Sequence, residues 1–341
     1  MFAWSDLAFP VTRPVAIGLA LFALSLTGTP DTLTAQAAPE RLFDSCVAQA
    51  PLVDEGTCAD AALAAQALSS GVGLLQSAGG TIPASPSTAG IRVAGSPRIV
   101  IDGGVGWSSF RAPDLSSSPG AGGVREEQRM ATMAVRATSA VGIFEGFSPV
   151  PTVGGILSVD AVGSATLHWL PGSRGFSGST VGWGAGVRVG VLRESFSLPG
   201  VTLSAMHYRT GTVRYGEVDV SGARASLSPR ATSIRAVVGR DLLAVGLVGG
   251  VGWDRYTGDA RIEAATAPGQ PAGTVEAGPE SMRLTRRYLF AGANYTWLVA
   301  QLAGELTWAR TPFPLSDLPG TGPFEPGATE LQGAISVRIT Y

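Results

Sequence analysis

The sequence of 341 residues predicts an all-β fold, a transmembrane antiparallel β-barrel of about ten strands, with twelve as the alternative. Three observations predict this fold. From Pro97 onward, segments of barrel-strand length alternate between apolar and polar residues. The connections between these segments alternate between long and short. Tryptophans recur at the same end of the predicted strands.

The alternating segments are the predicted strands, and they have a period of two residues. The eighth segment is ambiguous, because both of its faces are mixed between Arg286 and Ala293. In the last segment, Leu331, Ile335 and Val337 alternate with polar residues, and the chain ends on Tyr341. A half-buried strand of a soluble sheet would show the same alternation, so the other two observations decide between the two folds. The predicted strands cover residues 97–110, 127–143, 155–169, 180–194, 200–217, 229–240, 242–257, 280–293, 298–310 and 328–341.

The connections indicate how the strands run. Long outer loops and short periplasmic turns are typical of membrane barrels with both termini in the periplasm. The predicted long connections are rich in Gly, Pro and Ser and cover residues 111–126, 170–179, 218–228, 258–279 and 311–327. The predicted short ones are residues 195–199, a turn at Asp241 and residues 294–297, whereas residues 144–154 form a longer exception.

The tryptophans provide an independent test, because aromatic girdles mark the two edges of the membrane in such barrels. If odd-numbered strands run outward, five indoles reach the outer rim on the apolar face, and Trp297 falls in a short turn. A soluble sheet has no reason to collect its tryptophans at one rim. The predicted girdle residues are Trp107, Trp169, Trp183, Trp253 and Trp308.

Residues 1–37 read as a secretory signal peptide. Arg13 precedes an apolar run from Val15 to Leu26, and the small residues Ala35 and Ala37 form a cleavage site. The apolar run is shorter than the ~20 residues that a transmembrane helix needs, and no other stretch approaches that length. The mature chain would begin at Ala38, and the barrel would occupy residues 97–341.

Residues 38–96 form the predicted segment ahead of the barrel. Cys46 and Cys58 would form a structural disulfide in an oxidising periplasm, since no CxxC spacing indicates a metal or redox pair. Ala59 to Gln76 is rich in Ala and Leu and is expected to be helical. The segment could plug the barrel, cap its periplasmic mouth or form a mobile tail, and the disulfide disfavours the tail.

Charged residues of the inward parity are candidate residues of the lumen. They form either a structural network of buried ion pairs or a track for a polar or anionic solute, and the structural network is favoured. The inward glycines of segments 180–194 and 242–257 suggest that the lumen keeps some room. The candidates are Arg98, Asp102, Arg136, Asp160, Arg188, Arg235, Glu305 and Arg338.

Composition and motifs exclude several function classes. The net charge of −2, with no basic run, disfavours a nucleic-acid partner. No metal spacing, phosphate loop or GxSxG elbow occurs, so neither a cofactor nor a metal is expected. A lipid hydrolase is the enzymatic alternative, and it would need a base beside a nucleophile. Only two histidines could serve: His168, which shares a strand face with Ser164 and Thr166, and His207. A non-enzyme is therefore expected.

The terminal strand and the arrangement of the chain resemble bacterial outer-membrane β-barrel proteins. This resemblance implies a location in the outer membrane of a Gram-negative cell, contact with outer-membrane lipid, and recognition by the barrel-assembly machinery through the strand that ends at Tyr341. An N-terminal segment ahead of a C-terminal barrel also resembles, in architecture alone, the long-chain fatty-acid transporter family. That resemblance implies a porin-like function, passive transport of small amphipathic or hydrophobic solutes. A structural or adhesive barrel is the alternative.

Overall fold

The computed structural model describes residues 32–50, 53–77, 81–90, 96–117, 127–147, 155–195, 198–265, 273–310, 318 and 330–340. Leu33–Tyr341 forms one compact unit. Most of the predicted signal peptide and the terminal Tyr341 lie outside the described residues. The predicted cleavage after Ala37 would fall inside a helix, α2, and it stays a prediction.

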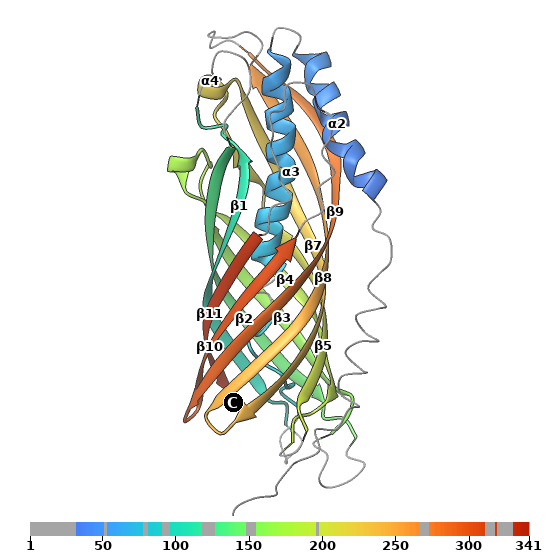
Figure 1. Ribbon diagram of the computed structural model, residues 1–341, viewed down its shortest axis with the longest axis vertical. Coiled ribbons are helices and arrows are strands. Elements are labelled where there is room, and N and C mark those ends of the chain that lie inside the picture. The colour runs from blue at the N-terminus through green and yellow to red at the C-terminus, as the bar shows by residue number, and fades with distance from the viewer. Residues whose placement is uncertain are drawn as a thin grey trace, which may run out of the picture. The chain divides into compact units, whose positions relative to one another are not determined.

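Ten long strands close an antiparallel barrel in the described part of the chain, as the sequence predicted (Figure 1). Neighbours in sequence pair with each other, β5 pairs with β7, and β1 closes the barrel against β11. A short extra strand, β6, attaches to β7. The strands are β1 Ile99–Pro113, β2 Glu127–Phe144, β3 Ser158–Trp169, β4 Thr180–Leu192, β5 Gly200–Thr210, β6 Val213–Tyr215, β7 Ala223–Leu242, β8 Val245–Ala265, β9 Thr274–Trp297, β10 Ala300–Arg310 and β11 Glu330–Thr340.

The pairing registers fix the tilt of the strands. Following paired residues once around the barrel from Gly200 of β5, and continuing the β4–β5 register two residues past the pair Gly182–Thr210, leads to position 212, a shear of twelve residues. The path runs through Gly239, Val248, Gly292, Glu305, Ala334, Gly106, Ala134, His168 and Thr180. For ten strands, this shear gives a tilt of about 40° and a distance of about 20 Å between opposite walls.

Three strands extend further than the sequence predicted. Strands β7, β8 and β9 include most of the predicted loops 218–228 and 258–279. In these extensions the outward positions are charged, which hid the strands from a search for apolar alternation. The inward positions carry residues such as Leu227, Ala260 and Ile262, which are fully buried. The strands continue because their inward face has a helix to cover.

The short turns also lie slightly later in the chain than predicted. The β7–β8 turn is Leu243–Ala244 rather than Asp241, and the β9–β10 turn is Leu298–Val299 rather than residues 294–297. Both turns lie at the end of the barrel where β1 begins and β11 ends. We call this the short-turn end and its opposite the far end.

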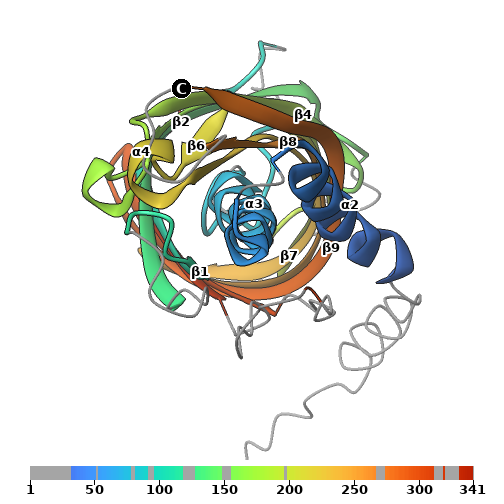
Figure 2. The same ribbon diagram turned by 90° about the horizontal axis from the view of Figure 1, so that it is seen from above.

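Two helices precede the barrel. Helix α2, Thr32–Gln49, lies at the rim beside β9, where Arg41 forms an ion pair with Glu280 at 3.0 Å (Figure 1). Helix α3, Glu55–Ser77, runs inside the ring of strands, as the view along the barrel shows (Figure 2). Cys46 and Cys58 are joined by a disulfide, as predicted, so the two helices are linked covalently.

Helix α3 is long and apolar enough to cross a membrane by length and composition, which the sequence reading did not recognise. The whole apolar stretch is buried, because the barrel wall surrounds it. A lumen between walls about 20 Å apart, narrowed by inward side chains, leaves about the 10–12 Å of one helix. The Ala, Gly and Ser residues of α3 keep it thin enough to fit. Two shorter helical turns, η1 Gly172–Arg174 and α4 Val218–Ser221, lie in connections.

The inward glycines do not leave the barrel wall open, so that inference from the sequence was wrong. A Cβ atom on Gly184 would lie 2.3 Å from the ring of Tyr208, and one on Gly252 would lie 2.0 Å from Tyr288. Aromatic side chains of neighbouring strands occupy the space in front of these glycines. The glycines therefore allow large inward rings in a narrow barrel.

Candidate functional site: the lumen and the segment threaded through it

Toward the far end of the barrel, the lumen is filled by apolar contacts between α3 and the strands β1, β7 and β8. Leu68 and Val72 of the helix are fully buried in one cluster with Phe110, Leu227 and Ile262. This packing explains why the Ala- and Leu-rich stretch becomes a stable helix here, because burial of apolar surface drives its association with the wall.

Two glycines bring α3 against wall aromatics. A Cβ atom on Gly71 would lie 2.1 Å from the ring of Phe110, and one on Gly73 would lie 2.5 Å from the ring of Tyr256. Real side chains do not approach each other so closely. Only glycine allows this contact, so the helix is seated at a fixed height against β1 and β8.

Polar contacts hold the C-terminal end of α3. The Ser77 hydroxyl donates to Asp254 Oδ2 at 2.5 Å, and the Tyr256 hydroxyl donates to the same oxygen at 2.5 Å. Arg136 of β2 donates from Nη2 to the Leu75 carbonyl oxygen at 2.7 Å. Helix C-termini leave carbonyls without intrahelical partners and carry partial negative charge, so a guanidinium stabilises this end.

A second polar contact joins the middle of α3 to β9 and β11. Ser70 donates to Glu330 Oε1 at 3.2 Å, and Glu330 forms a buried ion pair with Arg286 at 2.8 Å. The Arg286 guanidinium also lies 5.4 Å from the ring centre of Tyr256. This ion pair therefore holds the middle of the helix from the part of the wall that follows β1, at β11 and β9.

Residues 81–90 continue from α3 toward the short-turn end, and three buried ion pairs of the wall hold them. In the first, Arg235 bonds to Glu305 Oε1 at 2.7 Å and to Thr81 Oγ1 at 2.7 Å. Its guanidinium also lies 4.0 Å from the ring centre of Phe290. Both charged side chains are almost fully buried.

The second ion pair joins Arg338 to Asp102 at 3.7 Å, and Arg338 also donates to the Pro83 carbonyl oxygen. In the third, Arg188 forms an ion pair with Asp160 at 2.8 Å, and Asp160 accepts from the Ala89 amide at 2.8 Å. Each wall ion pair thus bonds to the threaded segment as well as to its own partner. Such bonds satisfy charges whose burial would otherwise be costly.

The lumen candidates of the sequence lie mainly in this network. Asp102, Asp160, Glu305 and four arginines, Arg136, Arg188, Arg235 and Arg338, are buried inside the barrel. Arg98 lies just before β1 and is half-buried. Sequence reasoning missed Asp254, Arg286 and Glu330, which are buried in the same lumen. Asp254 and Glu330 have inward parity within predicted strands, so the same rule could have found them, whereas the strand of Arg286 was ambiguous.

Outside the charged network, the buried polar groups of the strands that no described residue satisfies lie on one side of the lumen wall. Both ring nitrogens of His168 and the hydroxyl of Tyr208 belong to this set. The same holds for Ser108, Thr132, Thr138, Ser164, Thr202, Thr210 and Gln332, which all lie on β11 and β1 to β5. Helix α3 packs mainly against β1, β7 and β8, so β2 to β5 form a polar wall away from it.

The histidines do not form a catalytic pair in the described residues. On one strand face, Ser164 and His168 are four residues apart, about 13 Å. His207 faces outward, and its Nδ1 lies 3.2 Å from Thr232 Oγ1. No group of three or more possible metal ligands occurs in the described residues.

The outer surface divides into an apolar band and a charged extension. At this tilt each residue advances about 2.5 Å along the barrel axis. On that scale, Trp107, Trp183, Trp253 and Trp308 lie within about 2 Å of one level, about 25 Å from the short turns, and Trp169 lies about 7 Å farther. A height of about 25 Å matches the apolar band of a membrane barrel.

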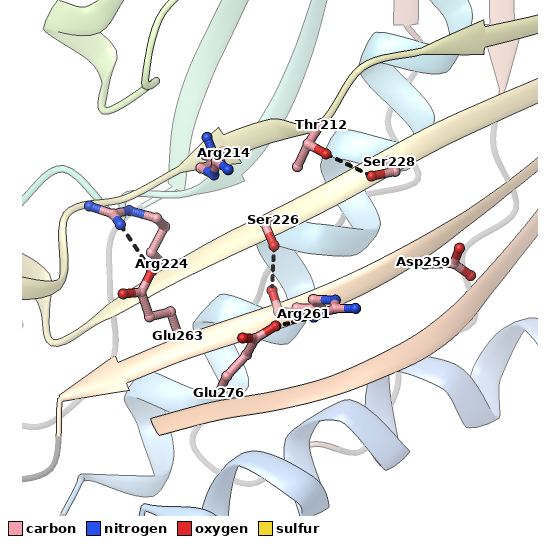
Figure 3. Close-up of a pocket in the computed structure, with 9 residues that line it drawn as sticks. All are labelled: Thr212, Arg214, Arg224, Ser226, Ser228, Asp259, Arg261, Glu263 and Glu276. Atoms are coloured by element: carbon pink, nitrogen blue, oxygen red, sulfur yellow. Dashed lines mark hydrogen bonds and ion pairs between the residues drawn. The ribbon is translucent and has the colours of Figure 1, made fainter. Parts of the chain in front are cut away.

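The extension beyond that level has a groove on its outer face (Figure 3). The groove encloses about 410 Å³ between β6, β7, β8 and β9. Arg224 and Glu263 form an ion pair at 2.9 Å across it, and Arg261 pairs with Glu276. Its lining carries three arginines and three acidic residues, so its charge is balanced: Thr212, Arg214, Arg224, Ser226, Ser228, Asp259, Arg261, Glu263 and Glu276.

Comparisons with known proteins found matches among solved structures alone. No protein-family model matches the sequence, and no curated protein matches it. Similar solved structures include the OmpT protease of Escherichia coli, at 11% identity over 75% of this chain and all of that one, with a TM-score of 0.36.

Two further solved structures are similar at the same level. The translocator domain of the autotransporter NalP from Neisseria meningitidis is 11% identical over 72% of this chain and 88% of its own, with a TM-score of 0.37. The Ail protein of Yersinia pestis is 10% identical over 72% and 99%, with a TM-score of 0.29. With TM-scores below 0.5, these likenesses add nothing to the argument. The closed antiparallel barrel with its apolar outer band is by itself the architecture of a transmembrane β-barrel.

Proposed function

We propose that this protein is a closed barrel of the bacterial outer membrane that anchors its own N-terminal helical hairpin, α2 and α3, at the cell surface. One observation carries the proposal. The chain passes through the whole lumen, from the far end where α3 begins to the short-turn end where β1 begins. Short turns lie on the periplasmic side in such barrels, so α2 and the start of α3 face the outside of the cell, while the rest of α3 lies in the lumen.

The contacts of the threaded segment favour an anchored role over a removable plug. Glycine contacts hold α3 at Phe110 and Tyr256, and three wall ion pairs hold residues 81–90. Withdrawal of the segment would leave the carboxylates and guanidiniums of these pairs with fewer partners in a confined space. The ion pairs themselves would stay intact, and the cost is the loss of the hydrogen bonds with Thr81, Pro83 and Ala89, about 1.5–3 kcal/mol for each bond to a charged group.

The surface proposal is tested by an epitope tag. A tag inserted at Val53, between α2 and α3, should bind antibody on intact cells. The matched control places the same tag in the turn Leu243–Ala244, where antibody should bind only after the outer membrane is permeabilised. Binding at Val53 that also requires permeabilisation would refute the proposed orientation.

Passive transport is the second candidate function, and the polar wall of β2 to β5 favours it. Buried polar groups are normally satisfied by hydrogen bonds to protein or water. The unsatisfied polar groups of this wall make no hydrogen bond to α3. The proposed path for small solutes therefore runs between these groups and the helix. This lining suits polar or amphipathic solutes better than hydrophobic ones, and the long-chain fatty-acid comparison gains nothing from it.

Solute flux into liposomes separates the two candidates. In the closed-anchor proposal the intact mature chain conducts no faster than empty liposomes, and deletion of residues 38–90 raises the flux. In the transport proposal the intact chain already admits small solutes such as glycerol. Hydrolysis of a phospholipid that is lost on replacing His168 would instead support an enzyme.

A further inference from the structure

The outer face of the barrel carries an arginine arc that no stretch of the sequence reveals. Five strands in a row, β5, β7, β8, β9 and β10, each place one outward arginine at nearly the same height. The arc consists of Arg209, Arg230, Arg255, Arg287 and Arg310, and all five side chains are exposed.

The registers establish the common height. Arg209 is paired with Arg230, and Arg287 with Arg310, across neighbouring strands. At this tilt the five arginines lie within about 4 Å of one level, and that level is about 4 Å beyond the tryptophans. Adjacent strands at equal height are about 6 Å apart, so the arc is about 25 Å long.

The arc carries a strong excess of positive charge. Asp259 lies farther from the apolar band than the arc does, and it pairs with Arg230 at 3.3 Å. Between the short turns and the arc, the outward positions of these five strands carry no acidic residue. Arg209 lies over the ring of Trp183 at 5.9 Å, so its stem crosses the edge of the apolar band. Even with Arg287 set aside, the four other arginines of the arc and the carboxylate of Asp259 leave a net charge of about +3 among these side chains.

The opposite half of the barrel lacks this charge at the same level. There, β11, β3 and β4 present Leu331, Trp169 and Val181, all exposed and apolar. The groove on the extension is balanced in charge, so it does not share the property either. At the level just beyond the tryptophans, the excess positive charge is therefore confined to one half of the barrel.

The geometry points to a binding site for the phosphate groups of an anionic lipid of the outer leaflet. Guanidinium groups bind phosphate in a bidentate manner and are always charged. Basic side chains next to a membrane surface attract anionic lipids and lose that attraction with salt. The acyl chains of such a lipid would lie along the apolar band, and its phosphates would reach the arc just beyond the tryptophans.

The proposal rests on the outer-membrane placement of the barrel and is independent of whether the lumen conducts. Its test uses the full mature protein in neutral detergent and measures binding of bisphosphorylated lipid A by native mass spectrometry. The variant R209Q/R255Q/R310Q should bind about tenfold more weakly or worse, because three of the five phosphate partners are lost. The control R111Q/R129Q/R174Q removes equal charge from the other side and should bind like the wild type.

Four outcomes would overturn the proposal. These are equal weakening by both triple variants, equal binding of dephosphorylated lipid A, displacement of the lipid by an equal concentration of inorganic phosphate, and wild-type affinity that does not fall with salt. Displacement by inorganic phosphate would indicate a free-anion site. If the triple variant does not fold, the single variant Arg255→Gln and the salt dependence of the wild type decide the question.

Discussion

Replacing Gly71 by alanine sets helix propensity against packing in the lumen. In an isolated helix the change would stabilise α3 by about 1 kcal/mol. In the barrel the new Cβ would lie 2.1 Å from the ring of Phe110, a wall residue with only 2% exposure. Overpacking of a tight core costs about 1–3 kcal/mol. The clash should outweigh the propensity, with a net loss of up to about 2 kcal/mol in the packing of α3.

Hydrogen exchange of the α3 amides in detergent measures this loss. Each 1.4 kcal/mol corresponds to about a tenfold fall in protection, so protection should fall roughly tenfold or more. The double variant G71A/F110L should recover most of it, because leucine leaves room for the new methyl group. Increased protection in G71A, or no recovery in the double variant, would show that the helix is not pressed against β1, and the reasoning would fail.

Three further predictions follow from the network and the closure of the barrel. Arg235→Gln should lower barrel stability by about 3–5 kcal/mol by leaving Glu305 unpaired, whereas Arg235→Met with Glu305→Leu should recover most of this loss. The temperature of the heat-modifiable gel shift measures the stability of both variants. Equal stability of the two would count against the ion pair. Replacing Cys46 and Cys58 by serine should destabilise the hairpin by about 2–3 kcal/mol, seen as lost exchange protection in α2 with an unchanged barrel, so an unchanged α2 would contradict a pinning role. Deletion of residues 339–341 should prevent closure, because β11 pairs with both β1 and β10, and a normal heat-modifiable band in the truncated protein would disprove this.

The sequence alone predicted the barrel and most of its strands. Alternation has a period of two wherever one strand face meets lipid and the other meets the lumen. Residues such as Val181 and Gly182 can therefore be assigned to a face from their immediate neighbours in the sequence. All ten predicted segments correspond to strands of the barrel. The three that were too short, β7 to β9, extend beyond the apolar band, where the pattern inverts. Outward residues such as Arg261 are charged there, and inward residues such as Ile262 are apolar.

The contents of the lumen and the charge of the outer face were decided by the tertiary structure. The sequence around Gly71 and Ser77 does not predict their contacts with Phe110 and Asp254, because these contacts join residues far apart in the chain. Likewise, Arg209 and Arg310 are about a hundred residues apart, so no basic run exists for a sequence reading to find. They reach one level because ten tilted strands with a shear of twelve residues bring them there. Parity along a strand is set by neighbouring residues, whereas height around a barrel exists only once the sheet has closed.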